Sequence, residues 1–348
     1  MRLSEFDYEL RSELIAQQPL AERDASRMLV VDRAAHTWTD SNFKSFTEYL
    51  REDDVVVVNN SRVIPARLKG RREESGGQVE IFLVRELEEK VWETLVRPGG
   101  RLKRGAEVNF DNRGLKAEIT DDPGSELRRV RFHCEGSFDE VLAGIGVTPL
   151  PPYIKRTSEN SAEDRERYQT VYAKQRGAIA APTAGLHFTP AVLTEIEKRA
   201  ALAEVTLHVG YGTFEPVRVD DVDQHSVSPE RFEISEQAAH KINETRKRGG
   251  RVIVVGTTTM RALESSATSA SATEGPVVAG AGEAKLTIKP GYKFRVADAL
   301  LTNFHLPQSS LLILVSAFAG REFILRSYCH AVEARYRFYS YGDCMLIL

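Results

Sequence analysis

The pattern of hydrophobic positions changes twice along the chain and divides it into three stretches. In the first stretch, four consecutive valines at Val55–Val58 follow two aspartates and precede two asparagines. An uninterrupted β-branched run of this length is typical of a strand that is buried on both faces, as in a parallel sheet covered by helices on either side. This stretch therefore predicts an α/β arrangement.

The second stretch, from about Arg62 to Thr148, consists of short strand-like segments with little helical periodicity. These segments are Gln78–Arg85, Val91–Val96, Ala106–Phe110, Leu115–Thr120 and Arg128–Phe132. Sequences rich in Pro, Gly, Asn and Asp separate them and favour turns. Closely spaced short strands of this kind predict a small β-barrel.

The α/β pattern returns after residue 149. Thr189 and Pro190 suit the start of a helix that runs to about Arg199, and Ser235 suits the start of another that stops at the glycines 249 and 250. Further predicted elements are a strand at Ala203–Val209, a buried strand at Arg251–Val255, a surface loop at Ser265–Ala284 and an apolar strand or helix at Leu311–Ala319. We therefore predict a three-layer α/β/α domain, residues 1–61 and 149–348, interrupted by an inserted β-barrel domain at 62–148.

Composition places the chain among globular proteins, because 42% of its 348 residues are hydrophobic and 28% are charged. The longest apolar run, Leu311–Ala319, is about half of the ~18–20 residues that cross a bilayer. The first residues carry acidic side chains where a signal peptide needs an apolar segment. We expect a cytoplasmic protein that does not bind membranes.

Cysteine and histidine spacing gives no sign of a metal site. The three cysteines, Cys134, Cys329 and Cys344, form no CxxC pair, and the eight histidines form no HxH or HxxxH pair. We expect reduced thiols and no bound metal.

The net charge of −3 argues weakly against a protein whose main role is to coat nucleic acid. Basic residues nevertheless cluster locally in the second stretch. Such clusters are often no more than solvated faces; the alternative is contact with RNA phosphates. The candidate RNA-binding residues are Arg67, Arg71, Arg101, Lys103 and Arg104.

The segment that follows the predicted strand at Arg251–Val255 is the strongest local sign of a ligand site. Gly256 permits a tight turn, and the free amides of the helix that begins at Thr257 and Thr258 attract an anion. Arg261 in the first turn can form a forked pair with a carboxylate, and Glu264 lies one turn further on. The alternative is an ordinary capped helix that binds no ligand.

Three histidine-containing loops are also candidates. His187, with Thr183, precedes a helix, and a histidine can transfer protons near neutral pH. His208 lies where a strand meets a glycine-rich turn. Asn303 and His305 are polar residues between apolar neighbours, so they either build a turn or line a pocket. From these residues alone no reaction can be named.

Nine motifs in a fixed order are more specific than any single physical signal. They are Phe6–Leu10 with Glu13–Gln17, Val58–Leu68, Pro151–Ile154, Tyr168–Ala173, Ala181–Thr189, His208–Phe214, Gly256–Glu264, Thr302–Pro307 and Tyr336–Asp343. In order and spacing the chain resembles the S-adenosylmethionine:tRNA ribosyltransferase-isomerase family of queuosine biosynthesis, from residue 6 to the C-terminus.

The resemblance implies an enzyme that transfers and isomerises the ribosyl group of S-adenosylmethionine. The acceptor is the 7-aminomethyl-7-deazaguanine base at the wobble position of tRNA, and the products are epoxyqueuosine-tRNA, adenine and methionine. S-adenosylmethionine is then a co-substrate, with no permanently bound cofactor. The family fold is an α/β domain with an inserted β-barrel. We expect a monomer.

The chemistry implied by the resemblance needs a base to remove a proton beside the sulfonium, an acid for the leaving adenine and an anion clamp for the methionine carboxylate. We assign proton transfer to His187 or His305, with Glu264 polarising a partner. The clamp is assigned to Gly256, Thr257, Thr258 and Arg261. The other residues expected to bind substrate are Thr183, His208, Asn303, Asn60 and Arg62.

Two other functions compete with this hypothesis. An S-adenosylmethionine-dependent RNA methyltransferase would give S-adenosylhomocysteine, whereas the ribosyl transfer gives adenine and methionine. A non-catalytic tRNA-binding protein would bind tRNA without turnover and without regard to S-adenosylmethionine.

Overall fold

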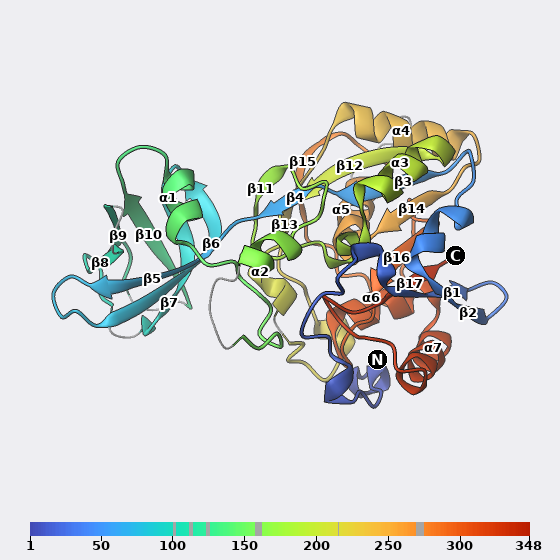
Figure 1. The fold of residues 1–348 in the computed structure, drawn as a ribbon, viewed down its shortest axis with the longest axis horizontal. Coiled ribbons are helices and arrows are strands. Elements are labelled where there is room, and N and C mark those ends of the chain that lie inside the picture. The colour runs from blue at the N-terminus through green and yellow to red at the C-terminus, as the bar shows by residue number, and fades with distance from the viewer. Residues whose placement is uncertain (100–101, 111–113, 123–125, 157–161, 215, 269–274) are drawn as a thin grey trace.

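The chain consists of a large α/β part and a smaller β-barrel beside it (Figure 1). The computed structural model describes residues 1–99, 102–110, 114–122, 126–156, 162–214, 216–268 and 275–348. The barrel strands fall between residues 67 and 133, and the chain on both sides of them builds the α/β part. The predicted fold class is therefore confirmed, while the boundaries proposed for the two domains stay a prediction.

In the described part of the chain, nine strands form the large sheet. In spatial order they are β15 (Gly280–Ala284), β13 (Glu230–Ile234), β12 (Ala201–Leu207), β3 (Val55–Asn59), β14 (Val252–Val255), β16 (Ala299–Asn303), β17 (Cys344–Ile347), β1 (Arg27–Asp32) and β2 (Thr37–Asn42). The run from β12 through β3 and β14 to β16 is parallel, β17 is antiparallel to β16, and β1 is parallel to β17. The sheet is thus mixed, with a parallel centre.

Strand β3 shows why the central strands are continuous runs of apolar residues. All five of its residues are buried, and its valines alternate between two hydrophobic clusters. Val55 and Val57 pack on the face that carries α4–α7, whereas Val56 and Val58 pack on the face that carries α3. Burial stabilises each such side chain by about 1.5–3 kcal/mol, so a polar residue on either face would be costly.

Helices cover both faces of the sheet. One face carries α4 (Glu236–Lys247), α5 (Thr257–Thr268), α6 (Ser310–Ala319) and α7 (Arg321–Glu333); the other carries α3 (Pro190–Arg199) and the 3-10 helix Phe43–Tyr49. Three helix starts follow the expected chemistry, because Thr189, Ser235 and Ser309 each accept a hydrogen bond from a backbone N–H of the first turn. The apolar segment Leu311–Ala319, left open as strand or helix, is helix α6.

The inserted barrel closes on itself among the described residues. Its strands, in order around the barrel, are β10 (Leu127–His133), β7 (Val91–Arg97), β6 (Gln78–Glu88), β5 (Arg67–Arg72), β8 (Glu107–Phe110) and β9 (Leu115–Ile119). Alternate residues of β10 are buried and exposed, as expected for a strand with one face in a core. Helix α1 (Phe138–Ile145) packs Phe138 and Leu142 against this core.

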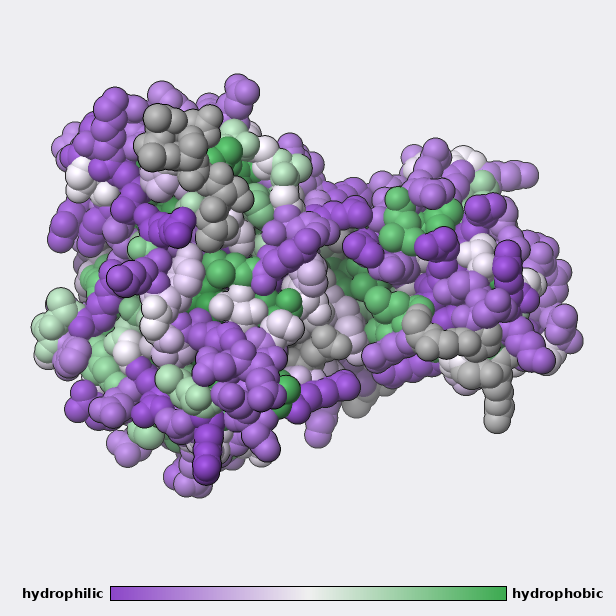
Figure 2. Space-filling model, turned by 180° about the vertical axis from the view of Figure 1, so that it is seen from behind, coloured by the Kyte–Doolittle hydropathy of each residue, from purple (hydrophilic) through white to green (hydrophobic). Residues whose placement is uncertain are grey.

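A short two-stranded connection lies between the barrel and the large sheet. It pairs β4 (Ser61–Val63) with β11 (Gln175–Ala178), and α2 (Ala162–Arg167) follows the barrel in the chain. Figure 2 shows a narrow waist at this junction, with hydrophobic surface where the two parts meet on an otherwise largely hydrophilic face. The remaining short 3-10 helices are Leu3–Phe6, Ser12–Leu14, Arg23–Ala25, Thr183–His187, Tyr211–Phe214 and Val222–Gln224.

The predicted loop at Ser265–Ala284 is wrong at both ends. Helix α5 continues to Thr268, and Gly280–Ala284 forms strand β15 at the edge of the sheet. Residues 269–274, in the middle of that prediction, lie outside the described residues. Small residues gave the segment a loop-like composition, but β13 supplies a strand with which Gly280–Ala284 can pair.

Candidate active site

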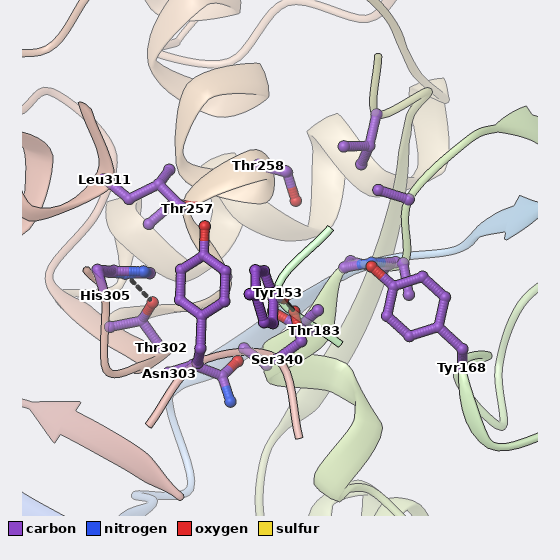
Figure 3. A pocket seen from close by; sticks show the side chains of 17 residues that line it. Tyr153, Tyr168, Thr183, Thr257, Thr258, Thr302, Asn303, His305, Leu311 and Ser340 are labelled. Carbon is purple, nitrogen blue, oxygen red and sulfur yellow. Dashed lines mark hydrogen bonds between the residues drawn. The ribbon is translucent and has the colours of Figure 1, made fainter. Parts of the chain in front are cut away.

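A pocket lies at the edge of the large sheet where β14 and β16 end. Because β14 and β16 are parallel neighbours, the residues that follow them meet at this edge, which is where open α/β sheets bind ligands. The space between its walls measures about 560 Å³, part of it open to solvent. Six predicted site residues line it (Figure 3): Thr183, Gly256, Thr257, Thr258, Asn303 and His305.

The turn from β14 into α5 forms one wall of the pocket. Gly256 has φ +87°, a conformation that favours glycine, and a Cβ there would have no contact closer than 3.8 Å. The glycine is therefore required by the backbone angle rather than by lack of space. Its N–H donates to the carbonyl of Leu301 over 2.8 Å, which ties the turn to β16. The first amides of α5 are thus held at the pocket, in agreement with the predicted anion-binding turn.

Asn303, the last residue of β16, fixes the tautomer of His187. Its amide Nδ2 donates to the backbone carbonyl of Asp343 over 3.3 Å and to Nε2 of His187 over 3.2 Å. A carbonyl oxygen can only accept, so the nitrogen of the amide must face both groups. His187 Nε2 therefore accepts, and Nδ1 carries the proton, which it donates to Ser26 Oγ over 2.9 Å.

Burial keeps His187 neutral. Loss of solvation lowers the pKa of its imidazole to about 4, and the nearby positive charges of Arg337 and Arg23 contribute to the same shift. His187 does not line the pocket; it contacts Asn303, which does. Its side chain instead borders a second, smaller cavity together with Arg23 and Ser340. In this structure His187 reaches the pocket only through its contact with Asn303, and its role in proton transfer stays a prediction.

His305 is the histidine that faces the pocket. Its Nε2 lies 3.0 Å from Thr302 Oγ1, and its backbone N–H donates to the hydroxyl of Tyr328 over 3.2 Å. Burial lowers the pKa of its imidazole to about 3, so the ring is neutral near pH 7. A neutral ring can accept a hydrogen bond at this position, and of the two predicted histidines only His305 lines the pocket.

Glu264 does not have the predicted catalytic position. Its fully buried carboxylate accepts four hydrogen bonds from the segment 292–297, from the Tyr292 hydroxyl and the backbone N–H groups of Arg295, Val296 and Ala297, at 2.9–3.1 Å. It lines none of the pocket. Four donors satisfy a carboxylate, so Glu264 fastens this segment to α5 rather than polarising a histidine.

Arg261 is also placed differently from the prediction. Its buried guanidinium forms a short ion pair with Glu230 and donates to the carbonyls of Ala284 and Ser228, over 2.7 and 3.2 Å. It borders a neighbouring cavity beside His225 rather than the pocket of Thr257 and Thr258. In this structure the helix start faces the pocket, whereas Arg261 ties β13 and β15 to α5, so the four-residue clamp stays a prediction.

Three further predicted substrate residues lie outside the pocket. Asn60 is bonded to Glu204 Oε2 over 3.1 Å and to the Thr206 hydroxyl over 2.8 Å, and Arg62 is exposed on β4. His208 is half-buried against Gly177, where a Cβ would approach its Nδ1 to 2.8 Å. Burial lowers the pKa of His208. None of the three belongs to the lining of the pocket.

The predicted RNA-binding residues of the barrel have different surroundings. Arg71, Lys103 and Arg104 are largely exposed, and Arg67 Nε lies 3.6 Å from Glu80 Oε1. Arg101 lies outside the described residues. Exposed cations of this kind remain available to phosphates, while Arg67 is partly neutralised by its partner.

The pocket residues that were not among the predicted site residues include Tyr153, Tyr168, Tyr339 and Ser340. Tyr153 and Tyr339 pack edge to face with ring centroids 4.0 Å apart, and the hydroxyls of Tyr153 and Ser340 make a short hydrogen bond. The motifs Pro151–Ile154, Tyr168–Ala173 and Tyr336–Asp343 contain them, so their signal was present in the sequence. That signal was their place in motifs of fixed order, because tyrosine and serine by themselves do not point to a catalytic site.

Within the described ranges, no group of three or more His, Cys, Asp or Glu side chains is arranged to hold a metal ion. No described helix has both the length and the apolar character to span a bilayer.

The comparisons with known proteins agree over the whole chain. Residues 3–347 match a family model described as queuosine biosynthesis protein. Two relatives named S-adenosylmethionine:tRNA ribosyltransferase-isomerase, from Natranaerobius thermophilus and Pelotomaculum thermopropionicum, are 49% and 50% identical and cover 100% of this chain and 99% and 100% of their own. The crystal structure of S-adenosylmethionine tRNA ribosyltransferase from Thermotoga maritima is 37% identical, covers 99% of this chain and 100% of its own, and gives a TM-score of 0.56. The resemblance found in the sequence is therefore confirmed: the chain belongs to the queuosine biosynthesis protein family.

Proposed function

We propose that this chain is an S-adenosylmethionine:tRNA ribosyltransferase-isomerase. It transfers and isomerises the ribosyl group of S-adenosylmethionine onto the 7-aminomethyl-7-deazaguanine base at the wobble position of tRNA. The products are epoxyqueuosine-tRNA, adenine and methionine. The observation that supports this most strongly is the 48–50% identity to relatives of that name over the full length of the chain.

The chemistry of the co-substrate explains what the pocket must provide. The sulfonium acidifies the adjacent ribose carbon, so a base can remove a proton there. The bonds from the ribose to adenine and to sulfur break in the course of the reaction, and the acceptor amine must be neutral to attack. We assign the methionine carboxylate to the amides at the start of α5, Gly256–Thr258, because a helix N-terminus attracts an anion.

His305 and Asn303 are proposed to contact the reacting groups. The ring of His305 at the pocket wall is neutral and can accept a hydrogen bond from the substrate, and the carbonyl oxygen of Asn303 has no partner among the described residues. That oxygen can therefore accept a hydrogen bond from a substrate N–H. His187 is proposed as a positioning residue that holds the amide of Asn303 in this orientation.

The acceptor tRNA is proposed to lie along the waist between barrel and sheet, with the modified base extruded into the pocket. The exposed Arg71, Lys103 and Arg104 would contact its phosphates. We further propose that the enzyme is a cytoplasmic monomer without a resident cofactor, since S-adenosylmethionine itself supplies the ribosyl group.

Mass analysis of tRNA and small products tests this function. The substrate is tRNA carrying the aminomethyl-deazaguanine, incubated with the protein and S-adenosylmethionine. A ribosyl-sized mass gain on that base, with release of adenine and methionine, is the expected result. A methyl-sized gain with S-adenosylhomocysteine would make the protein a methyltransferase, and tRNA binding without any turnover would make it a binding protein.

A further inference from the structure

The pocket has no charged side chain among the described residues that line it. Its polar members are tyrosines, threonines, a serine, Asn303 and His305, and the depressed pKa of His305 keeps that ring neutral near pH 7. S-adenosylmethionine nevertheless carries a permanent positive charge on sulfur. No carboxylate among the described lining residues is available to pair with that charge.

Aromatic rings of the pocket can do this, and two of them, Tyr153 and Tyr339, pack against each other. Tyr153 comes from the segment that leaves the barrel, and Tyr339 comes from the loop before β17. Their centroids are 4.0 Å apart with an interplanar angle of 75°, and both residues are half-buried, so part of each remains open. In Figure 3 the ring of Tyr153 lies in the middle of the pocket, between Thr183 and Ser340. A third ring, Tyr168, lines the pocket as well.

Both rings are held in place by their surroundings. The hydroxyl of Tyr153 makes a short hydrogen bond with Ser340, and the backbone N–H of Tyr339 donates to the carbonyl of Phe304 over 3.1 Å. Tyr339 has φ +73°, a backbone conformation that side chains with a Cβ rarely adopt and that persists only where neighbouring structure fixes it. Neighbouring residues therefore hold both rings in fixed positions at the pocket.

A sulfonium matches this environment better than an ammonium would. It has no N–H to donate, so it gains nothing from hydrogen-bond acceptors beyond their partial charge. The electron-rich faces of aromatic rings attract a cation of this kind when water is excluded. A thioether of the same shape is neutral and gains only packing from the same rings.

We propose that Tyr153 and Tyr339 recognise the sulfonium of S-adenosylmethionine and make the pocket prefer this charged co-substrate to neutral thioether analogues. The inference rests on the proposed function, and it assigns the sulfonium a subsite separate from the carboxylate at α5. It has a consequence for turnover. When the bond from sulfur to ribose breaks, its electron pair stays on sulfur, so methionine leaves as a neutral thioether that the rings no longer attract.

Dissociation constants for S-adenosylmethionine and S-adenosylhomocysteine, measured by calorimetry on the full chain, test the proposal. The variants are Tyr153→Leu and Tyr339→Leu, which remove a ring, and Tyr153→Phe and Tyr339→Phe, which keep it. In each leucine variant the preference for the sulfonium over the thioether should fall by roughly 3- to 30-fold, because the lost packing weakens both ligands whereas the lost attraction to a cation weakens only the sulfonium. Retained thioether binding also shows that the variant is folded. The phenylalanine variants should keep the preference of the wild type.

Equal weakening of both ligands in both leucine variants would overturn the proposal, because the rings would then only shape the pocket. A wild-type protein that binds neither ligand and does not turn over tRNA would instead remove the proposed function itself. The two failures are distinguishable. The first is seen in the ratio of the two ligand affinities in the variants, and the second is seen in binding and turnover by the wild type.

Discussion

The side-chain amide of Asn303 donates to Nε2 of His187 over 3.2 Å, and this bond links the pocket to the buried start of β1 through Ser26. The second acceptor of the amide, the carbonyl of Asp343, determines its orientation. His187 thereby acts on the pocket through Asn303.

Replacing Asn303 tests this link. In Asn303→Asp a carboxylate oxygen would face two acceptors, the carbonyl of Asp343 and Nε2 of His187, so the fold should lose about 1–3 kcal/mol at pH 8. Acidification should restore part of the loss, because a protonated His187 can donate to the new carboxylate. Urea unfolding at pH 8 and pH 6 measures both effects. Equal losses at the two pH values would contradict the predicted coupling.

The two buried histidines should make the protein sensitive to acid. Their folded pKa values, about 4 for His187 and about 3 for His305, lie below the ordinary 6.5, so the unfolded chain binds more protons at intermediate pH. Stability is therefore complete above pH 6.5 and falls as the pH drops toward 4, by about 2 kcal/mol per histidine at pH 5. Urea titrations from pH 7.5 to 5 check this. The variant His305→Gln should show a shallower dependence, and an unchanged slope would exclude His305 as a source.

Glu264 should matter for stability and not for chemistry. In Glu264→Gln the amide can accept fewer of the four hydrogen bonds, so unfolding should require about 2–3 kcal/mol less. Turnover per folded molecule should be unchanged. Tyr292→Phe, which removes a single donor, is the matched control and should cost about 1 kcal/mol. If Glu264→Gln lost turnover while keeping its stability, a catalytic role for this carboxylate would be restored.

Arg261 and Glu230 should behave as a buried structural pair. Arg261→Ala leaves the carboxylate uncompensated and should destabilise the fold by about 3–5 kcal/mol. The double change Arg261→Met with Glu230→Gln removes both charges and should recover much of that stability. Denaturant unfolding of the single and double variants measures which of them is more stable. A stable Arg261→Ala protein with weakened S-adenosylmethionine binding would return the arginine to the carboxylate clamp.

The barrel cations should govern tRNA affinity and its salt dependence. Changing Arg71, Lys103 and Arg104 to alanine should reduce the slope of log affinity against log salt, by up to about one for each phosphate that is no longer neutralised. S-adenosylmethionine affinity should not change, since none of the three lines the pocket. Filter binding at several salt concentrations measures the slope. A slope equal to that of the wild type would place the tRNA elsewhere.

Most of the fold could be predicted from the local pattern of hydrophobic residues, because the buried face of a strand or helix sets the spacing of its apolar side chains. Val55–Val58 and Arg251–Val255 indicated the sheet centre, and the closely spaced short segments between Gln78 and Phe132 indicated the barrel. Strands β1, β2 and β17 were not predicted. The pairing of β1 with β17 joins residues more than 300 positions apart, as between Met28 and Cys344, and local periodicity carries no information about such partners.

The site was predictable where a backbone requirement left a mark in the sequence. Gly256, with its positive φ, and Asn303, at the end of β16, were both placed correctly at the pocket. Arg261 and Glu264 lie outside the pocket, and the sequence could not show this because a charged residue in the first turns of a helix can face either way. Their orientation depends on partners such as Glu230 and Tyr292, which only the tertiary structure brings near.

The position of β17 has a consequence for synthesis of the protein. This strand, at residues 344–347, is what joins β1 and β2 to the rest of the sheet, and the loop just before it contains Tyr339, Ser340 and Asp343. A ribosome must therefore release nearly the whole chain before the first strands can dock and the pocket can close. Until then the N-terminal hairpin has no sheet to join, so a nascent chain stalled shortly before residue 344 would be both inactive and exposed to chaperones and proteases.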